Sequence, residues 1–389
     1  MERLIPGADC WWAVGTHRVA RLPVDAMDAR GRLKPEAASV LASAGLCQPA
    51  DSDLYHVTVL ITTRCNLGCS YCFQNTDLPK AGPAGPSVRV PSLVLDDAAT
   101  DRIMAFTRRQ MTARGASKLD LVLFGGEPAM YPRACLGLLS AASELALVRA
   151  AMYSNGTLLT PRVAGEFARA GLHQVQVTLD GDQPAHDTYR RTLGGRRTFH
   201  RILDNLAAVS AATDLQLTLR VNLTRESIGD APALVRRLTD RLEPARFGLY
   251  FSLVFDPGIG FGESLQPSVA LAQRVGGLYR QAMAAGFSVP SPRITACLAC
   301  GTFAGETGAV VNADGTLYSC WESAGKQGYD VGTVTDGYLP DEQIRPRWVA
   351  CGYSSSAPPS GAQRFQDALD GILLDLQYDL GRLTSAGAR

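Results

Sequence analysis

The sequence of 389 residues lacks the marks of membrane, secreted and nucleic-acid-binding proteins. No run of 18 apolar residues occurs, so we expect no membrane span. The opening residues, MERLIPGADCWW, lack a basic stretch followed by an apolar one, and we therefore expect no signal peptide and a cytoplasmic location. With 38 Lys and Arg against 37 Asp and Glu, the net charge of +1 gives no long-range attraction to nucleic acid or an anionic membrane.

Cysteine, in contrast, is abundant, because the chain holds ten. Disulfides are disfavoured in a reducing cytoplasm, so this number needs another explanation. One group of three lies within residues 65–72 and a second group of three lies between residues 297 and 320. Clusters of this kind indicate metal or iron–sulfur ligation. Isolated cysteines are more often small buried hydrophobic side chains, which we predict for Cys10, Cys47 and Cys135.

Strand and helix patterns alternate from about residue 55 onward. Near-continuous apolar strands separated by helices are typical of a parallel sheet with a covered outer face. Six such units predict an α/β fold, a partial (β/α)6 barrel of TIM-like type, whose ligands bind at the carboxyl ends of the strands. The strands are predicted at residues 55–61, 119–124, 150–153, 173–179, 215–221 and 247–255.

Three parts are predicted along the chain. Residues 1–50 read as a small element with a hairpin and a helix, which is either a cap or a docking site for a peptide. Residues 51–290 carry the barrel. Residues 291–389 form a cysteine-containing extension, in which Asp314-Gly315 predicts a hairpin and residues 363–380 predict a terminal helix.

The triplet Cys65-x3-Cys69-x2-Cys72 is the strongest chemical signal in the sequence. Three thiolates on one loop can bind three irons of a cubane [4Fe–4S] cluster, which leaves the fourth iron open to a small molecule. A zinc site normally needs four ligands, and no nearby His or Cys supplies the fourth. The spacing therefore predicts an iron–sulfur cluster with one open iron.

With Tyr71 before its last cysteine, this triplet resembles the signature of the radical S-adenosylmethionine (SAM) superfamily. The resemblance implies that the open iron chelates the amino and carboxylate groups of SAM. Electron transfer from the cluster would then cleave SAM to methionine and a 5′-deoxyadenosyl radical, which abstracts a hydrogen atom from substrate. The protein binds and orients these groups.

A second stretch looks like the GGEP motif of the same family. It consists of Gly125, Gly126, Glu127 and Pro128, directly after the second predicted strand. The resemblance implies that its backbone and the Glu127 carboxylate receive the SAM ammonium. A plain glycine-rich turn is the competing interpretation.

Two further segments follow the third and fourth strands. Ser154 and Asn155 resemble polar residues that contact the ribose or the methionine carboxylate, although an ordinary Asn-Gly turn is an alternative. Residues 177–190 look like the SLDG…HD..R segment of peptide-modifying members. In that segment, Arg190 or Arg191 is expected to pair with a carboxylate of SAM or of a peptide.

The second cysteine group resembles the start of a SPASM or shorter twitch extension, which carries auxiliary clusters. It comprises Cys297, Cys300 and Cys320, the last reached through a hairpin that turns at Gly315. Only Cys351 follows, so we expect one auxiliary [4Fe–4S] cluster. For Cys351 three roles stay open: the fourth ligand of this cluster, a hydrogen donor to a substrate radical, or a structural residue. A structural zinc site is the alternative for the whole group.

The motifs together favour a radical SAM enzyme that modifies a ribosomally made precursor peptide, by a thioether or carbon–carbon crosslink or by epimerisation. Its expected cofactors are SAM, the SAM-binding cluster and the auxiliary cluster. Its expected partners are the peptide and a reductant such as flavodoxin or ferredoxin. Small-molecule chemistry, such as dehydrogenation, epimerisation or cofactor synthesis, is one alternative, and a non-catalytic iron–sulfur sensor is another.

Overall fold

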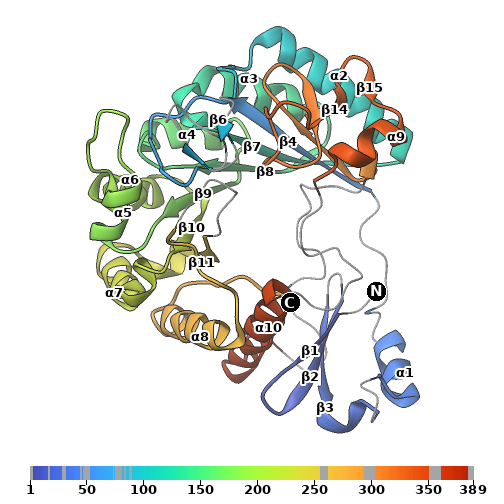
Figure 1. The fold of residues 1–389 in the computed structure, drawn as a ribbon, viewed down its shortest axis with the longest axis vertical. Helices are drawn as coiled ribbons and strands as arrows, with labels where there is room; N and C mark the ends of the chain where they lie inside the picture. Colours follow the sequence, from blue (N-terminus) through green and yellow to red (C-terminus); the bar gives the residue numbers. More distant parts are fainter. Residues whose placement is uncertain are drawn as a thin grey trace.

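A computed structural model gives the arrangement of most of the chain (Figure 1). Four of the ten cysteines, Cys47, Cys297, Cys300 and Cys351, lie outside the described residues. The structure describes residues 3–15, 18–28, 32–43, 46, 53–72, 74, 81–82, 85–86, 90–254, 262–292, 303–349 and 361–383.

A ten-stranded sheet with the order β11-β10-β9-β8-β7-β4-β12-β13-β14-β15 organises the molecule. The first six of these strands are parallel neighbours in chain order, and β11 is left as one edge of the sheet. The sheet curves without closing (Figure 1), which confirms the predicted partial barrel. The six strands are β4 (Leu54–Thr62), β7 (Lys118–Gly125), β8 (Leu147–Ser154), β9 (Gln174–Leu179), β10 (Gln216–Leu223) and β11 (Phe247–Leu253).

Helices cover the outer face of these strands. Asp96 and Thr160 begin two of them by accepting hydrogen bonds from first-turn amides, as expected of N-cap residues. A short helix, α5 (Gln183–Tyr189), was absent from the prediction because seven residues carry too little periodicity. The longer helices are α2 (Asp97–Arg114), α3 (Pro132–Ser143), α4 (Pro161–Arg169), α6 (Phe199–Ala212), α7 (Ala231–Arg241) and α8 (Val269–Ala284).

Alternation along the strands divides the helix-covered core from the inner face. On β10, Leu217, Leu219 and Val221 belong to the main hydrophobic core. Arg220 and Asn222 point to the other face, where Arg220 donates to the Asn222 side chain at 3.1 Å. Strand residues alternate in this way because successive side chains point to opposite faces. The inner face therefore carries the polar groups that an open barrel presents to ligands.

The predicted hairpin of the extension continues the main sheet. β12 (Gly308–Val311) pairs in parallel with β4, and β13 (Thr316–Tyr318) returns antiparallel to β12. The turn between them uses Gly315 at φ +92°, a conformation that glycine adopts without strain. Three short elements follow, namely β14 (Asp330–Thr333), β15 (Gly337–Tyr338) and α9 (Asp341–Ile344).

The N-terminal element packs against the last helix of the chain. Its three strands are β1 (Arg3–Pro6), β2 (Cys10–Val14) and β3 (Val19–Pro23), with α1 (Pro35–Ser43) beside them. Arg3 pairs with Asp367 and Asp370 of α10 (Gly361–Asp379), and the Trp12 indole donates to Asp375 at 2.7 Å. In Figure 1 this unit lies at the end of the molecule opposite α2 and α9. The boundaries of the three predicted parts stay a prediction.

Two smaller findings complete the fold. The proline-rich stretch before α2 contains a pair of two-residue strands, β5 (Ala81–Gly82) and β6 (Gly85–Pro86). No helix within the described part of the chain is long and apolar enough to cross a membrane.

Candidate active site at the carboxyl ends of the strands

The loop that carries Cys65, Cys69 and Cys72 leaves the carboxyl end of β4, where ligands of parallel sheets bind. It is fixed by its backbone. Gly68 N–H donates to the carbonyl of Arg191 at 2.9 Å, and Cys72 N–H donates to the carbonyl of Cys69 at 3.2 Å. The loop is therefore anchored to the segment that follows α5.

Cys69 is buried, Cys65 and Cys72 are partly buried, and the three thiols are close enough to influence one another. Burial raises the pKa of Cys65 above its ordinary value, and Glu127, Cys69 and Cys72 raise it further. Burial also raises the pKa of Cys69 to about 12, against the opposing effect of the Arg190 guanidinium. Iron binds thiolates, so cluster assembly must displace these protons.

The donor set fits an iron–sulfur cluster. The Sγ of Cys65 accepts from the amide of Leu67 at 3.4 Å and from Nδ2 of Asn155 at 3.7 Å, and such donors tune thiolate-bound clusters. In the described ranges, however, no three His, Cys, Asp or Glu side chains are arranged to hold a metal ion. The fit to a cluster therefore rests on the ligand type, the spacing of the three cysteines and these donors to Cys65.

Two glycines let the end of β7 touch the cysteine loop. A Cβ on Gly126 would lie 2.1 Å from the carbonyl oxygen of Arg64, and a Cβ on Gly125 would lie 2.2 Å from that of Thr62. Gly125 also has φ +124°, which other residues rarely adopt. Close approach of backbone to backbone requires both residues, so this turn holds the loop in place.

Glu127 is fully buried and joins three elements. Its Oε1 accepts from Ser154 Oγ at 2.8 Å and from the Ala129 amide at 3.0 Å, while Oε2 accepts from the Asn155 amide at 2.6 Å. Burial raises the pKa of Glu127, against these three donors. A carboxylate has about four lone-pair positions, so one acceptor position remains for a ligand.

Asn155 links β8 to the cysteine loop. Its Nδ2 donates to the side chain of Asn66 at 2.8 Å, and its Oδ1 accepts from the Thr157 hydroxyl at 2.6 Å. Both Ser154 and Asn155 are buried and hydrogen-bonded within the chain. Their arrangement fits positioning of the turn and of the loop that it touches.

Tyr71 lies at the centre of a buried polar network. Its hydroxyl donates to Asp180 and accepts from Arg190 at 3.0 Å and from Asn222 at 3.1 Å, while Asn222 also donates to Asp180 at 3.0 Å. Burial raises the pKa of Asp180, and the Arg190 guanidinium is the strongest of the groups that lower it. The sequence prediction named Tyr71 and Arg190 but assigned no role to Asp180 or Asn222. Their position at strand ends was the available signal.

The two candidate arginines differ in environment. Arg190 is buried beside Cys69 and Asp180, and among the described residues its Nε has no hydrogen-bond partner. Arg191 is exposed, and its Nε donates to the carbonyl of Asp187 at 2.5 Å. A buried cation with a free donor suits an anionic ligand, so Arg190 is the better candidate for a carboxylate.

Replacing Tyr71 with phenylalanine should weaken SAM binding, because Arg190, Asp180 and Asn222 lose their shared hydroxyl. We expect about a tenfold rise in the dissociation constant for SAM, which corresponds to about 1.4 kcal/mol. Anaerobic calorimetry of the cluster-loaded protein measures it. Tyr329→Phe is the control, since Tyr329 is 42% exposed. Equal affinities for the two variants would contradict this role of the network.

Cys320 lies close to this site. The ring of the next residue, Trp321, stacks on Phe124 at 5.1 Å and meets Tyr153 edge-on at 5.8 Å, and these two rings precede the turns of β7 and β8. Burial lowers the pKa of Lys326, whereas the negative charges of Glu322, Cys320 and Cys72 raise it. The Lys326 ammonium therefore interacts electrostatically with one cysteine of each predicted group, Cys72 and Cys320.

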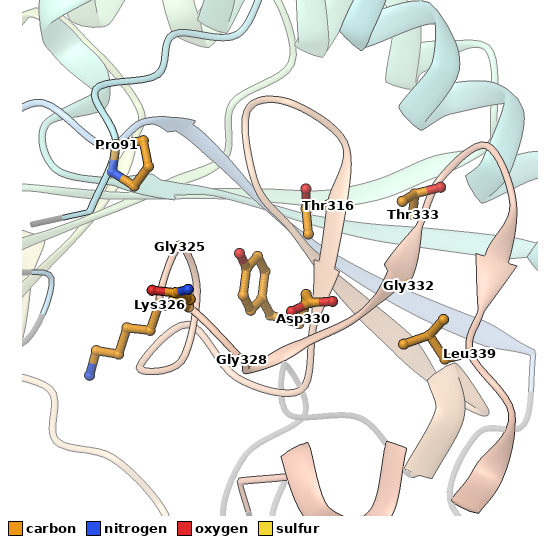
Figure 2. A pocket seen from close by; sticks show the side chains of 11 residues that line it. Pro91, Thr316, Gly325, Lys326, Gly328, Asp330, Gly332, Thr333 and Leu339 are labelled. Carbon is orange, nitrogen blue, oxygen red and sulfur yellow. The ribbon is translucent and has the colours of Figure 1, made fainter. Parts of the chain in front are cut away.

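A pocket of about 540 Å³ opens in the extension. In Figure 2, Lys326 lies near Pro91 at one end, and Thr333 and Leu339 lie at the other. No predicted site residue lines it. Its lining is Pro91, Thr316, Tyr318, Gly325, Lys326, Gln327, Gly328, Asp330, Gly332, Thr333 and Leu339.

Comparison with known families agrees with this geometry. Residues 59–237 match the model of the Radical SAM superfamily, and the match spans the cysteine loop and five of the six parallel strands. The chain therefore carries a radical SAM domain. Proteins of this family use a [4Fe–4S] cluster and SAM, and the cofactor prediction is confirmed at this level.

Relatives by sequence have several chemistries. GTP 3',8-cyclase of Caulobacter vibrioides is 31% identical over 191 residues, 46% of this chain and 47% of that protein. Fe-coproporphyrin III synthase of Methanosarcina barkeri is 26% identical over 193 residues, 47% of this chain and 41% of that protein. The matches thus span less than half of these relatives.

Two solved structures share the fold over most of the chain. Native anSMEcpe with bound AdoMet and Kp18Cys peptide has a TM-score of 0.61 at 13% identity, over 84% of this chain and 100% of that one. Streptococcus suis SuiB bound to precursor peptide SuiA has a TM-score of 0.51 at 14% identity, over 90% of this chain and 77% of that one. At these identities the likeness establishes the fold.

Proposed function

We propose that this protein is a radical SAM enzyme that modifies a peptide. The observation that carries the peptide substrate is the likeness of fold, over 84% and 90% of this chain, to two proteins solved with peptides bound. The placement of Trp321 against the ends of β7 and β8 supports it, because the extension then borders the site where the radical would form.

In this proposal each predicted residue has a distinct task. Cys65, Cys69 and Cys72 hold the cluster, which with bound SAM supplies the 5′-deoxyadenosyl radical. The turn at Gly126 and Glu127 positions the cysteine loop and offers one carboxylate acceptor to the SAM ammonium.

The remaining polar residues orient the methionine end of SAM. Arg190 offers its free Nε to the SAM carboxylate, and Tyr71 holds that guanidinium through the hydrogen bond between the two side chains. Ser154 and Asn155 fix the end of β8 through Glu127. Pre-organised donors of this kind lower the cost of orienting the bound group.

We also propose one auxiliary cluster on Cys297, Cys300 and Cys320, with Cys351 as its fourth ligand. Of these residues, only Cys320 lies in the described part of the chain, where it is buried and its Sγ accepts from the Glu322 amide at 3.5 Å. Two [4Fe–4S] clusters predict about eight irons per reconstituted chain. A value near four in the wild-type protein would remove the auxiliary cluster from the proposal.

The test of the peptide substrate uses short peptides encoded beside the gene. Incubated with SAM and a reductant, the protein should form 5′-deoxyadenosine and change one such peptide. Mass spectrometry then reports a crosslink as a loss of two hydrogens, while epimerisation leaves the mass unchanged and is read by chiral amino-acid analysis. SAM cleavage that no peptide stimulates, with every peptide recovered intact, would contradict the peptide substrate.

A small-molecule substrate is the second candidate. It is favoured by the sequence relatives, which include GTP 3',8-cyclase and Fe-coproporphyrin III synthase. Stimulation of SAM cleavage by a nucleotide or a porphyrin, and by no peptide, would decide for it.

A further inference from the structure

A basic turn, residues 191–197, connects α5 to α6, and its arginine side chains have no task in the proposed binding of SAM or the cluster. No acidic residue occurs between Asp187 and Asp204, whereas five arginines do. Three of them, Arg191, Arg196 and Arg197, are exposed, and unlike Arg190 none of them forms a salt bridge among the described residues. Unpaired positive charge at one surface point attracts and orients an anionic partner.

The basic turn is paired directly with the cysteine loop. Leu67 and Thr192 form an antiparallel bridge, and Leu193 N–H donates to the carbonyl of Asn66 at 3.0 Å. Asn66 adjoins Cys65, and Gly68, which donates to the Arg191 carbonyl at 2.9 Å, adjoins Cys69. A molecule seated on the basic turn is therefore separated from two cluster thiols by little more than paired backbone.

The basic turn is also held at both ends. The Asp187 carboxylate accepts from the amides of Thr198 and Phe199 at 3.0 and 3.1 Å, and the Thr192 amide donates to the carbonyl of Arg196 at 3.0 Å. At its tip Leu193 is 51% exposed, an apolar side chain among cations. A fixed apolar anchor within a charged rim is the usual composition of a docking site.

We propose that the basic turn is the surface on which a small acidic electron-transfer protein docks to reduce the cluster held by Cys65, Cys69 and Cys72. One electron passes from the partner, a reduced flavodoxin or ferredoxin, to the oxidised cluster. The partner is oxidised by one electron, and no proton or group is transferred. Small, weak and charge-guided interfaces are typical of such redox encounters. This inference uses the SAM-cleaving site and is independent of the substrate.

The test compares two double charge reversals in the cluster-loaded protein. Arg196→Glu with Arg197→Glu alters the basic turn, and Arg274→Glu with Arg280→Glu makes the same charge change on exposed positions of α8. Stopped-flow absorbance follows cluster reduction by flavodoxin hydroquinone, and photoreduced 5-deazaflavin serves as a small neutral donor. A pull-down with oxidised flavodoxin reports binding without turnover.

We expect the basic-turn variant to react with flavodoxin about tenfold more slowly at low salt, with the difference shrinking at high salt. Its flavodoxin binding should weaken in parallel, while its reaction with deazaflavin stays at the wild-type rate and the α8 variant behaves as wild type. Equal slowing in both variants, or no slowing in either, overturns the proposal. Slowing with deazaflavin as well would make the basic turn a support of the cluster and would likewise overturn it.

Discussion

Cys69→Ser should abolish cleavage of SAM and remove about four irons from each reconstituted chain. A [4Fe–4S] cluster with one open iron depends on three protein thiolates, and a serine hydroxyl is a poor substitute for iron. Cys69 is also the most buried thiol of the loop, at 8% exposure. Iron analysis, the 400 nm absorbance and 5′-deoxyadenosine formation measure the loss.

Cys10→Ser is the matched control for this change. Cys10 is also buried, but it lies in β2 near Asp375 of α10 and takes no part in the predicted cluster sites. We expect wild-type iron content and SAM cleavage from it. If Cys69→Ser kept its iron and its activity, the assignment of the triplet would be wrong.

The second large effect is expected from Gly126→Ala. The added Cβ would lie 2.1 Å from the carbonyl oxygen and 2.4 Å from the carbonyl carbon of Arg64, and both atoms are backbone of the cysteine loop. The loop must move, which also strains the hydrogen bond from Glu127 N–H to the Arg64 carbonyl. We expect unfolding free energy to fall by about 3 kcal/mol, and iron content and SAM affinity to fall with it.

For Gly137→Ala, the same chemical change, we expect the free energy of unfolding to rise instead of fall. Gly137 is exposed in α3, and its Cβ would meet nothing within 4 Å. Alanine there should raise unfolding free energy by about 0.5–1 kcal/mol, because it restricts the unfolded chain. Urea denaturation of both variants compares them. Equal stability of Gly126→Ala and Gly137→Ala would refute the close backbone approach.

Much of the barrel was predictable because its signals are local. Apolar strands and amphipathic helices are recognisable within windows of roughly six to fifteen residues, and caps such as Asp96 and Thr160 mark the helix starts. The third predicted strand, at residues 150–153, was too short, because α3 ends at Ser143 and β8 already begins at Leu147. Ala146 adopts a left-handed φ of 52° between them, and the sequence does not signal this break because alanine rarely adopts that conformation.

The candidate site was predictable only in part. Cys65, Cys69 and Cys72 are recognisable because metal ligands on one loop need fixed spacing. Asp180 and Asn222 were missed as network members because their partner, Tyr71, is more than 100 residues away along the chain. Their meeting depends on the order and register of all the parallel strands from β4 to β10, which no local pattern encodes.

The sequence by itself determined the chemistry that this protein can hold: three thiolates at cluster spacing, a glycine-rich turn after the next strand and a surplus of arginine after α5. Only the tertiary structure decided how these parts work together. It surrounded the buried Glu127 with three donors, left the Nε of Arg190 without a partner among the described residues and paired the basic turn with the cysteine loop. The reason is physical. Ligand type is a property of residues, whereas burial and unsatisfied hydrogen bonds arise only when distant segments exclude water together.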